Sequence, residues 1–227
     1  MSSCVVLFAK KPEPGKVKTR LQSHLNPEDA ARLYRAFLLD CAEELQAAKA
    51  EVKVIAYAPA NAEEALRDLL GEMGDFAYVP QPETDLGGRM EALVQWGFAQ
   101  GAERVVLLGS DSPSLPAEYI DRALELLQER EVVLGPSTDG GYYLVGRQRG
   151  DSRIFADVAW STGEVLKQSL QRLGAQSLGL LAPWYDVDTP AEAGFLKVHL
   201  EALARAGSEQ GRRSLEVLRT LDLPSPS

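Results

Sequence analysis

Short apolar runs recur along the chain, and most are followed by a stretch in which apolar positions repeat every three or four residues. The run at 4–9 is apolar and β-branched, and a polar stretch rich in Lys, Pro and Gly follows it. Such a run is typical of a strand buried on both faces of a parallel sheet. Further strands are predicted at residues 52–58, 76–79, 104–109, 132–135, 142–146 and 176–181.

The stretches between these runs predict helices. Asn26 is a favourable N-cap and Pro27 suits the first helical position, while Thr189 has the glutamate of a capping box three residues later. Helices are therefore predicted from 26, from 61, over about 89–100, from 116, from near 161 or 162, and from 189 to about 221. Strands that alternate with helices predict an α/β protein built from βαβ units.

No internal repeat, low-complexity linker or long shift in composition divides the chain. We therefore expect one domain over residues 1–222. The last five residues, 223–227, read Leu-Pro-Ser-Pro-Ser and predict a flexible tail.

Composition narrows the classes of protein that fit. Of 227 residues, 45% are hydrophobic and 25% are charged, which is the balance of a globular protein and excludes a disordered or fibrous one. The formal net charge of −9 repels phosphate backbones, so we expect no nucleic-acid partner. The two cysteines form no CxxC pair, and the apolar run near the N-terminus is too short to span a membrane. A soluble, cytoplasmic protein with reduced thiols is expected.

One segment departs from the acidic average. Five cations lie within eleven positions after the first predicted strand and face a single acid, Glu13. Ligands of open parallel sheets bind at the carboxyl ends of strands, so this loop suits a di- or triphosphate, although a solvated charge run remains an alternative. It is no Walker A motif, since Val17 follows Lys16, and the chain has no GxGxxG fingerprint. The residues expected to hold phosphate are Lys10, Gly15, Lys16, Lys18 and Arg20.

Two aspartates that follow predicted strands are candidate metal ligands. Asp111 comes after the strand at 104–109, and Asp188 precedes the N-cap Thr189. Two such carboxylates, completed by phosphate oxygens and water, suit Mg²⁺ or Mn²⁺. Their alternative roles are a local turn for Asp111 and favourable charge at a helix start for Asp188.

Other polar segments complete the candidate site. The Asp139-Gly140-Gly141 segment is either a bare hairpin turn or a site for a sugar hydroxyl or base. Trp160 and Trp184 are expected to pack in the core. The chain has no GxSxG elbow, and its two histidines lie near or inside predicted helices, which disfavours a hydrolase. The remaining candidates are Asp85 and Arg89 for nucleotide binding, and Ser110, Asp139, Gly140, Gly141 and Tyr142 for substrate binding.

Five segments together resemble one family over roughly residues 5–195. They read FAKKPEPGKVKTRL at 8–21, DLGGRM at 85–90, GSDSP at 109–113, GPSTDGGYYLVG at 135–146 and DVDTP at 186–190. They resemble the DUF2064 family, a bacterial group in the nucleotide-diphospho-sugar transferase superfamily that is often described as glycosyltransferases. The resemblance implies a GT-A fold, a Rossmann-like, mixed but mostly parallel sheet between layers of helices. It also implies Asp111 as a metal ligand, with either Asp186 or Asp188 as the second.

The function that the resemblance implies is metal-dependent transfer from an activated nucleotide. The first hypothesis is a glycosyltransferase that moves a sugar from a nucleotide sugar to a small acceptor, with Asp111 and Lys18 as catalytic residues and Asp139 as general base. The alternative is a nucleotidyltransferase that uses an NTP and a phosphorylated or acidic small molecule and releases pyrophosphate. The Lys-rich loop and the lone strand-end aspartate resemble those of phospholactate and molybdopterin guanylyltransferases as much as those of glycosyltransferases. Pro113 stands where many GT-A glycosyltransferases carry a second aspartate. A binding module without catalysis is a third possibility. The oligomeric state is left open.

Overall fold

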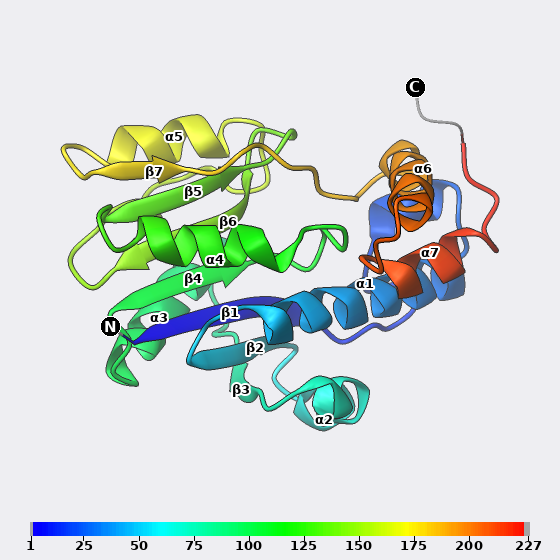
Figure 1. Ribbon diagram of the computed structural model, residues 1–227, viewed down its shortest axis with the longest axis horizontal. Helices are drawn as coiled ribbons and strands as arrows, with labels where there is room; N and C mark the ends of the chain where they lie inside the picture. The colour runs from blue at the N-terminus through cyan, green and yellow to red at the C-terminus, as the bar shows by residue number, and fades with distance from the viewer. Residues whose placement is uncertain (1, 225–227) are drawn as a thin grey trace.

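A seven-stranded sheet forms the centre of the protein. The computed structural model describes residues 2–224, and the strand order in the sheet is β3-β2-β1-β4-β6-β5-β7 (Figure 1). Within the described residues β6 runs antiparallel to both of its neighbours, whereas the other paired strands are parallel, so the sheet is mixed but mostly parallel. The strands are β1 (Ser3–Lys10), β2 (Val52–Ala58), β3 (Ala77–Pro80), β4 (Arg104–Leu108), β5 (Val132–Pro136), β6 (Tyr142–Gln148) and β7 (Leu178–Leu180).

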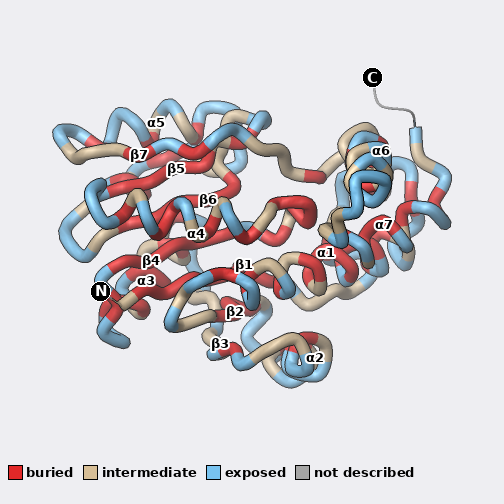
Figure 2. Tube along the Cα trace, viewed as in Figure 1, coloured by how far each residue is buried: buried red, intermediate tan, exposed pale blue. Residues whose placement is uncertain are grey.

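Helices cover both faces of this sheet. The α-helices are α1 (Pro27–Ala47), α2 (Glu63–Leu70), α3 (Leu86–Ala99), α4 (Ala117–Leu126), α5 (Val165–Arg172), α6 (Pro190–Arg205) and α7 (Arg212–Leu218), and two 3-10 helices are η1 (Thr19–Ser23) and η2 (Gly71–Met73). Successive side chains of β1 point to opposite faces of the sheet. Val5 and Leu7 pack with α1, α2 and α4 on one face, while Cys4 and Val6 pack with α3 on the other. The central strands are therefore buried on both faces (Figure 2).

Local sequence accounts for the longest helix. The side chain of Asn26 accepts a hydrogen bond from the backbone N–H of Asp29, and Pro27 occupies the first helical position. The face of α1 that meets the sheet carries the apolar residues with helical spacing. This helix extends beyond the sheet, and α6 and α7 lie beside it there (Figure 1).

Several predicted boundaries were wrong by a few residues. Helix α3 begins at Leu86 and not near 89, because Asp85 caps it through the N–H of Gly88. Asn61 does not cap α2, which begins at Glu63, and α5 begins at Val165 and not near 161. The strand predicted at 176–181 is the shorter β7. Residues 225–227 of the predicted tail lie outside the described residues.

None of the helices in residues 2–224 combines the length and the apolar character needed to cross a membrane.

Candidate active site

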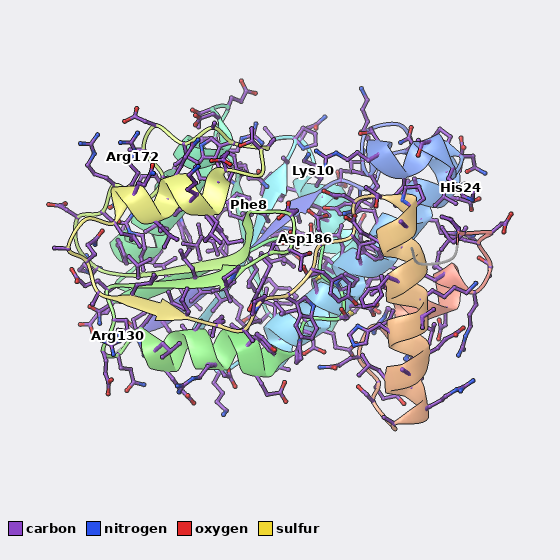
Figure 3. The ribbon with its side chains drawn as sticks, turned by 90° about the horizontal axis from the view of Figure 1, so that it is seen from above. Phe8, Lys10, His24, Arg130, Arg172 and Asp186 are labelled. Carbon is purple, nitrogen blue, oxygen red and sulfur yellow. The ribbon has the colours of Figure 1, made fainter. Side chains whose placement is uncertain are left out.

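A cleft of about 800 Å³ opens at the carboxyl ends of β1 and β4. Phe8, Lys10 and Asp186, which line it, lie together near the middle of the view in Figure 3. Twelve of the residues expected at a site also line it: Lys10, Lys16, Lys18, Arg20, Asp85, Arg89, Ser110, Asp111, Asp139, Gly141, Tyr142 and Asp188. Gly15 and Gly140 are not among the lining residues. The strand-end segments therefore converge, as parallel-sheet geometry predicts.

Lys18 lies at the centre of the charged part of the cleft. Its ammonium is 2.5 Å from Oδ1 of Asp111 and 3.0 Å from Oδ1 of Asp188, and its side chain is only 3% exposed. Burial lowers the pKa of Lys18, but the two carboxylates outweigh burial, so the pKa lies above its ordinary value. Lys18 is therefore a permanent cation that joins the two aspartates.

Asp186 holds two of the loops around the cleft together. One carboxylate oxygen accepts from the Ser112 hydroxyl at 2.6 Å and the other from the Ser137 hydroxyl at 2.9 Å. Burial raises the pKa of Asp186 to about 6, partly opposed by the bond from Ser112. Both oxygens of Asp186 are thus bonded to serine hydroxyls, whereas the two oxygens of Asp188 pair with the cations Lys18 and Arg20. Asp188 also meets Asp111 through Lys18, which favours Asp188 over Asp186 as the partner of Asp111.

Ser110 lines the cleft and is also tied into the scaffold. Its hydroxyl lies 2.8 Å from the hydroxyl of Tyr34, which also accepts the backbone N–H of Lys10 at 3.0 Å. Burial raises the pKa of Tyr34 above its ordinary value. These bonds fix the ends of β1 and β4 against α1.

The start of α3 forms one wall of the cleft. Asp85 is used as the N-cap of this helix, and the Nε of Arg89 donates to the carbonyl of Thr84 at 2.8 Å. Gly87 packs closely against Trp160, because a Cβ on Gly87 would lie 2.7 Å from the Trp160 Nε1. Asp85 is thus a structural cap, and Arg89 contributes charge to the wall.

The turn after β5 also lines the cleft. Asp139 accepts from the N–H of Gly141 at 2.9 Å, as in an Asx turn, and both residues line the cleft. Gly140 has φ +91°, and a Cβ there would collide with the Gly163 carbonyl oxygen. Gly140 is therefore needed for packing between two loops, and it is not among the residues that line the cleft.

Aromatic residues on the wall were only partly anticipated. Trp160, expected in the core, lines the cleft and meets the ring of Tyr142 edge to face at 6.4 Å. The Tyr142 hydroxyl is buried near Ser169, where burial raises its pKa, so only its ring can reach a ligand. Tyr34, Gln81 and Leu86 also line the cleft and were not predicted, because apolar, aromatic and amide side chains carry no distinct sequence signal for a site.

The donor set fits a divalent cation that brings ligands of its own. Asp111 and Asp188 converge on the same side of the cleft, their side chains are 42% and 37% exposed, and they already hold one cation, the Lys18 ammonium. Within residues 2–224 no group of three or more His, Cys, Asp or Glu side chains forms a complete metal site. Mg²⁺ typically takes one or two protein carboxylates and completes its shell with phosphate oxygens and water.

Comparison with known proteins defines the fold class first. The solved 4-diphosphocytidyl-2C-methyl-D-erythritol synthase from Anaerococcus prevotii DSM 20548 superimposes with a TM-score of 0.58, 10% identity and coverage of 88% of this chain and 96% of that chain. The CMP:2-keto-3-deoxy-manno-octonic acid synthetase complexed with CTP gives a TM-score of 0.55, 14% identity and coverage of 91% and 100%. The protein has the fold of nucleotide-diphospho-sugar transferases and cytidylyltransferases, as the sequence implied.

Closer similarities identify the family. A protein from Desulfovibrio desulfuricans G20, described as a candidate nucleotide-diphospho-sugar transferase, is 34% identical, with a TM-score of 0.87 over 97% of this chain and 95% of that chain. The family described as "Uncharacterized protein conserved in bacteria (DUF2064)" matches residues 38–162. The chain belongs to the DUF2064 family, which confirms the predicted membership.

One relative of known activity aligns over most of the chain. The 2-phospho-L-lactate guanylyltransferase of Methanothermobacter thermautotrophicus is 26% identical over 188 residues, which are 81% of this chain and 80% of the relative. These relatives are transferases, in agreement with the predicted enzyme class.

Proposed function

We propose that this protein is a nucleotidyltransferase that joins a nucleoside monophosphate unit from an NTP to a phosphorylated or acidic small molecule and releases pyrophosphate. The observation that carries the proposal is the convergence of the cationic loop and the Asp111–Lys18–Asp188 cluster on one cleft at the strand ends. The guanylyltransferase relative supports nucleotidyl transfer over sugar transfer. The sequence alone favoured sugar transfer.

The charges of the cleft suit such a reaction. Lys10, Lys16 and Arg20 line it and offer positive charge to a triphosphate. Asp111 and Asp188 would hold Mg²⁺ or Mn²⁺, which supplies charge neutralisation at the phosphates. Attack of an acceptor oxygen on the α-phosphate forms a P–O bond and breaks the bond to the β-phosphate, so the residues have mainly to position the two substrates.

The acceptor is expected to be anionic. Arg89 lines the cleft from the first turn of α3, on a different element from the cationic loop, and provides a second place for negative charge. A phosphate or carboxylate acceptor is already ionised at neutral pH, so it needs no general base. Asp139 would then contact substrate without removing a proton.

Pyrophosphate release tests the proposal directly. Purified protein is incubated with each of the four NTPs, Mg²⁺ or Mn²⁺ and a panel of phosphorylated and carboxylic acids, and pyrophosphate is measured by a coupled pyrophosphatase assay. Acceptor-dependent pyrophosphate is expected with at least one NTP. Its absence from every combination would reject nucleotidyl transfer with the acceptors tried.

Sugar transfer is the second candidate, and one observation favours it. The relative from Desulfovibrio desulfuricans G20, described as a candidate nucleotide-diphospho-sugar transferase, is 34% identical to this chain, whereas the guanylyltransferase is 26% identical. In this version Asp139 is the general base for an acceptor hydroxyl. Release of a nucleoside diphosphate from a nucleotide sugar, with no pyrophosphate from any NTP, would establish sugar transfer in its place.

A further inference from the structure

The Lys18 ammonium has no donor left for a ligand. It donates to the Val187 carbonyl oxygen at 2.7 Å and to Asp188 Oδ1 at 3.0 Å, and it lies 2.5 Å from Asp111 Oδ1. An ammonium group carries three N–H donors and no acceptor, so these three oxygens use all of them. In this arrangement Lys18 is not available as the phosphate-binding cation that its motif predicts.

The protein is built to hold Lys18 in this position. The Lys18 backbone has φ 47° and ψ 43°, a left-handed conformation that costs a non-glycine residue energy. Its ammonium lies 5.4 Å from the centre of the Phe37 ring and 6.0 Å from that of Tyr34, within the range of cation–π attraction. The other cations of the loop are more exposed: Lys10 and Lys16 are exposed, and the Arg20 side chain, which meets Asp188 Oδ2 at 3.4 Å, is 65% exposed.

We propose that Lys18 is a displaceable positioning residue. It holds Asp111 and Asp188 together through their Oδ1 atoms, while Oδ2 of Asp188 pairs with Arg20. A divalent cation that binds to both carboxylates takes over Oδ1 of Asp188 and so displaces Lys18. An ammonium and a dication that share the same two oxygens repel each other strongly at such short range, so one replaces the other. The displaced ammonium becomes available to a phosphate group of the substrate, which couples metal binding to nucleotide binding.

This inference rests on the proposed function for the nature of the ligand, but its tests contain no nucleotide. A failure of nucleotidyl transfer would therefore leave the exchange of cations measurable. Conversely, an active transferase in which Lys18 does not move would refute only the exchange.

The first test measures binding of Mn²⁺ alone, by electron paramagnetic resonance of the free ion. Lys18→Met removes the competing cation, and Lys16→Met is the matched control, since Lys16 is an exposed cation of the same loop. We expect Lys18→Met to bind Mn²⁺ at least about tenfold more tightly than wild type, and Lys16→Met to differ by less than about threefold, since solvent screens an exposed charge. Equal or weaker binding by Lys18→Met, or no binding by any of the three proteins, overturns the proposal.

The second test uses the wild-type protein and so does not depend on a variant that folds. Lysine acetylation is followed by mass spectrometry with and without saturating Mn²⁺, and Lys16 serves as the internal reference. Acetylation of Lys18 is expected to be slow without the metal and to rise when Mn²⁺ is added, while that of Lys16 stays constant. Continued protection of Lys18 in saturating Mn²⁺ contradicts its displacement.

Discussion

Asp111 combines an exposed carboxylate with a buried partner. Its side chain is 42% exposed, while Lys18, with which it pairs, is 3% exposed. Its backbone carbonyl also accepts the N–H of Val187 at 2.9 Å, so the backbone joins the two loops in addition to the side-chain contact through Lys18. A change of the side chain therefore leaves one connection between the loops in place.

Replacing Asp111 by Asn is expected to remove most of the activity from a protein that still folds. We expect kcat/KM for nucleotide transfer to fall at least about 100-fold, because the metal that neutralises the phosphates loses a charged ligand. The free energy of unfolding, measured by urea denaturation, should fall by about 1–3 kcal/mol, because the buried Lys18 loses one of its two carboxylate partners. Asp68→Asn, at an exposed position on α2, is the control, and equal activity of the two variants would exclude a catalytic role for Asp111.

At the scale of elements, the wall of the cleft depends on how closely α3 approaches the loop before α5. The sequence predicted both segments but placed the start of α3 three residues late, because two consecutive glycines there resemble a loop. Gly87 is part of the helix and is required by its neighbour, since a Cβ would lie 2.7 Å from Trp160 Nε1 and 2.8 Å from the Phe155 carbonyl oxygen. A tertiary contact, and not a turn, explains this glycine.

The Gly87→Ala variant tests this contact. The added methyl group should push α3 away from Trp160 and lower the free energy of unfolding by about 1–3 kcal/mol, as overpacking does. Gly71→Ala is the matched control, since Gly71 has helical angles and no atom lies within 4 Å of the place that its methyl group would take. Thermal or urea denaturation of the two variants distinguishes close packing from a general effect of glycine replacement, which predicts equal changes.

At the scale of the whole molecule, Asp40 connects the last helix to the first. Its side chain is 1% exposed, and Oδ2 accepts the N–H of Ser214 at 2.8 Å and the Ser214 hydroxyl at 2.5 Å. Arg213 lies 3.3 Å from Oδ1 and also pairs with Glu43 on α1. These bonds attach α7 to α1 at the end of the molecule away from β7 (Figure 1).

A dependence of stability on pH follows from this buried carboxyl. Burial raises the pKa of Asp40, against the bonds from Ser214 and Arg213, so between its ordinary and its raised pKa the folded state binds more protons than the unfolded state. Stability contributed by Asp40 is therefore lost as pH rises through that window. Asp40→Asn keeps the shape and removes the titration, so its stability relative to wild type should improve as pH rises from about 4 to 7. Urea denaturation across this range measures it, and a constant difference would contradict the assignment.

Local patterns in the sequence determined the strands and helices, because the residues that start, end and bury each of them lie close together in the chain. Apolar runs placed the seven strands to within a few residues, and Asn26 and Thr189 cap α1 and α6 as expected. The rule that parallel strands present their carboxyl ends at one edge also located most of the cleft.

The tertiary structure alone decided what each charged side chain does. Lys16, Lys18 and Arg20 look equivalent in sequence, yet the Lys18 side chain is buried, whereas Lys16 is exposed and Arg20 reaches Asp188 from the surface. The acceptors of Lys18 at Val187 and Asp188 lie about 170 positions further along the chain. The same holds for Ser110, whose partner Tyr34 lies on α1, and for Gly140, which packs against Gly163. Contacts between distant segments leave no periodic trace in sequence, so the sequence could place the cleft but not divide its cations between ligand and scaffold.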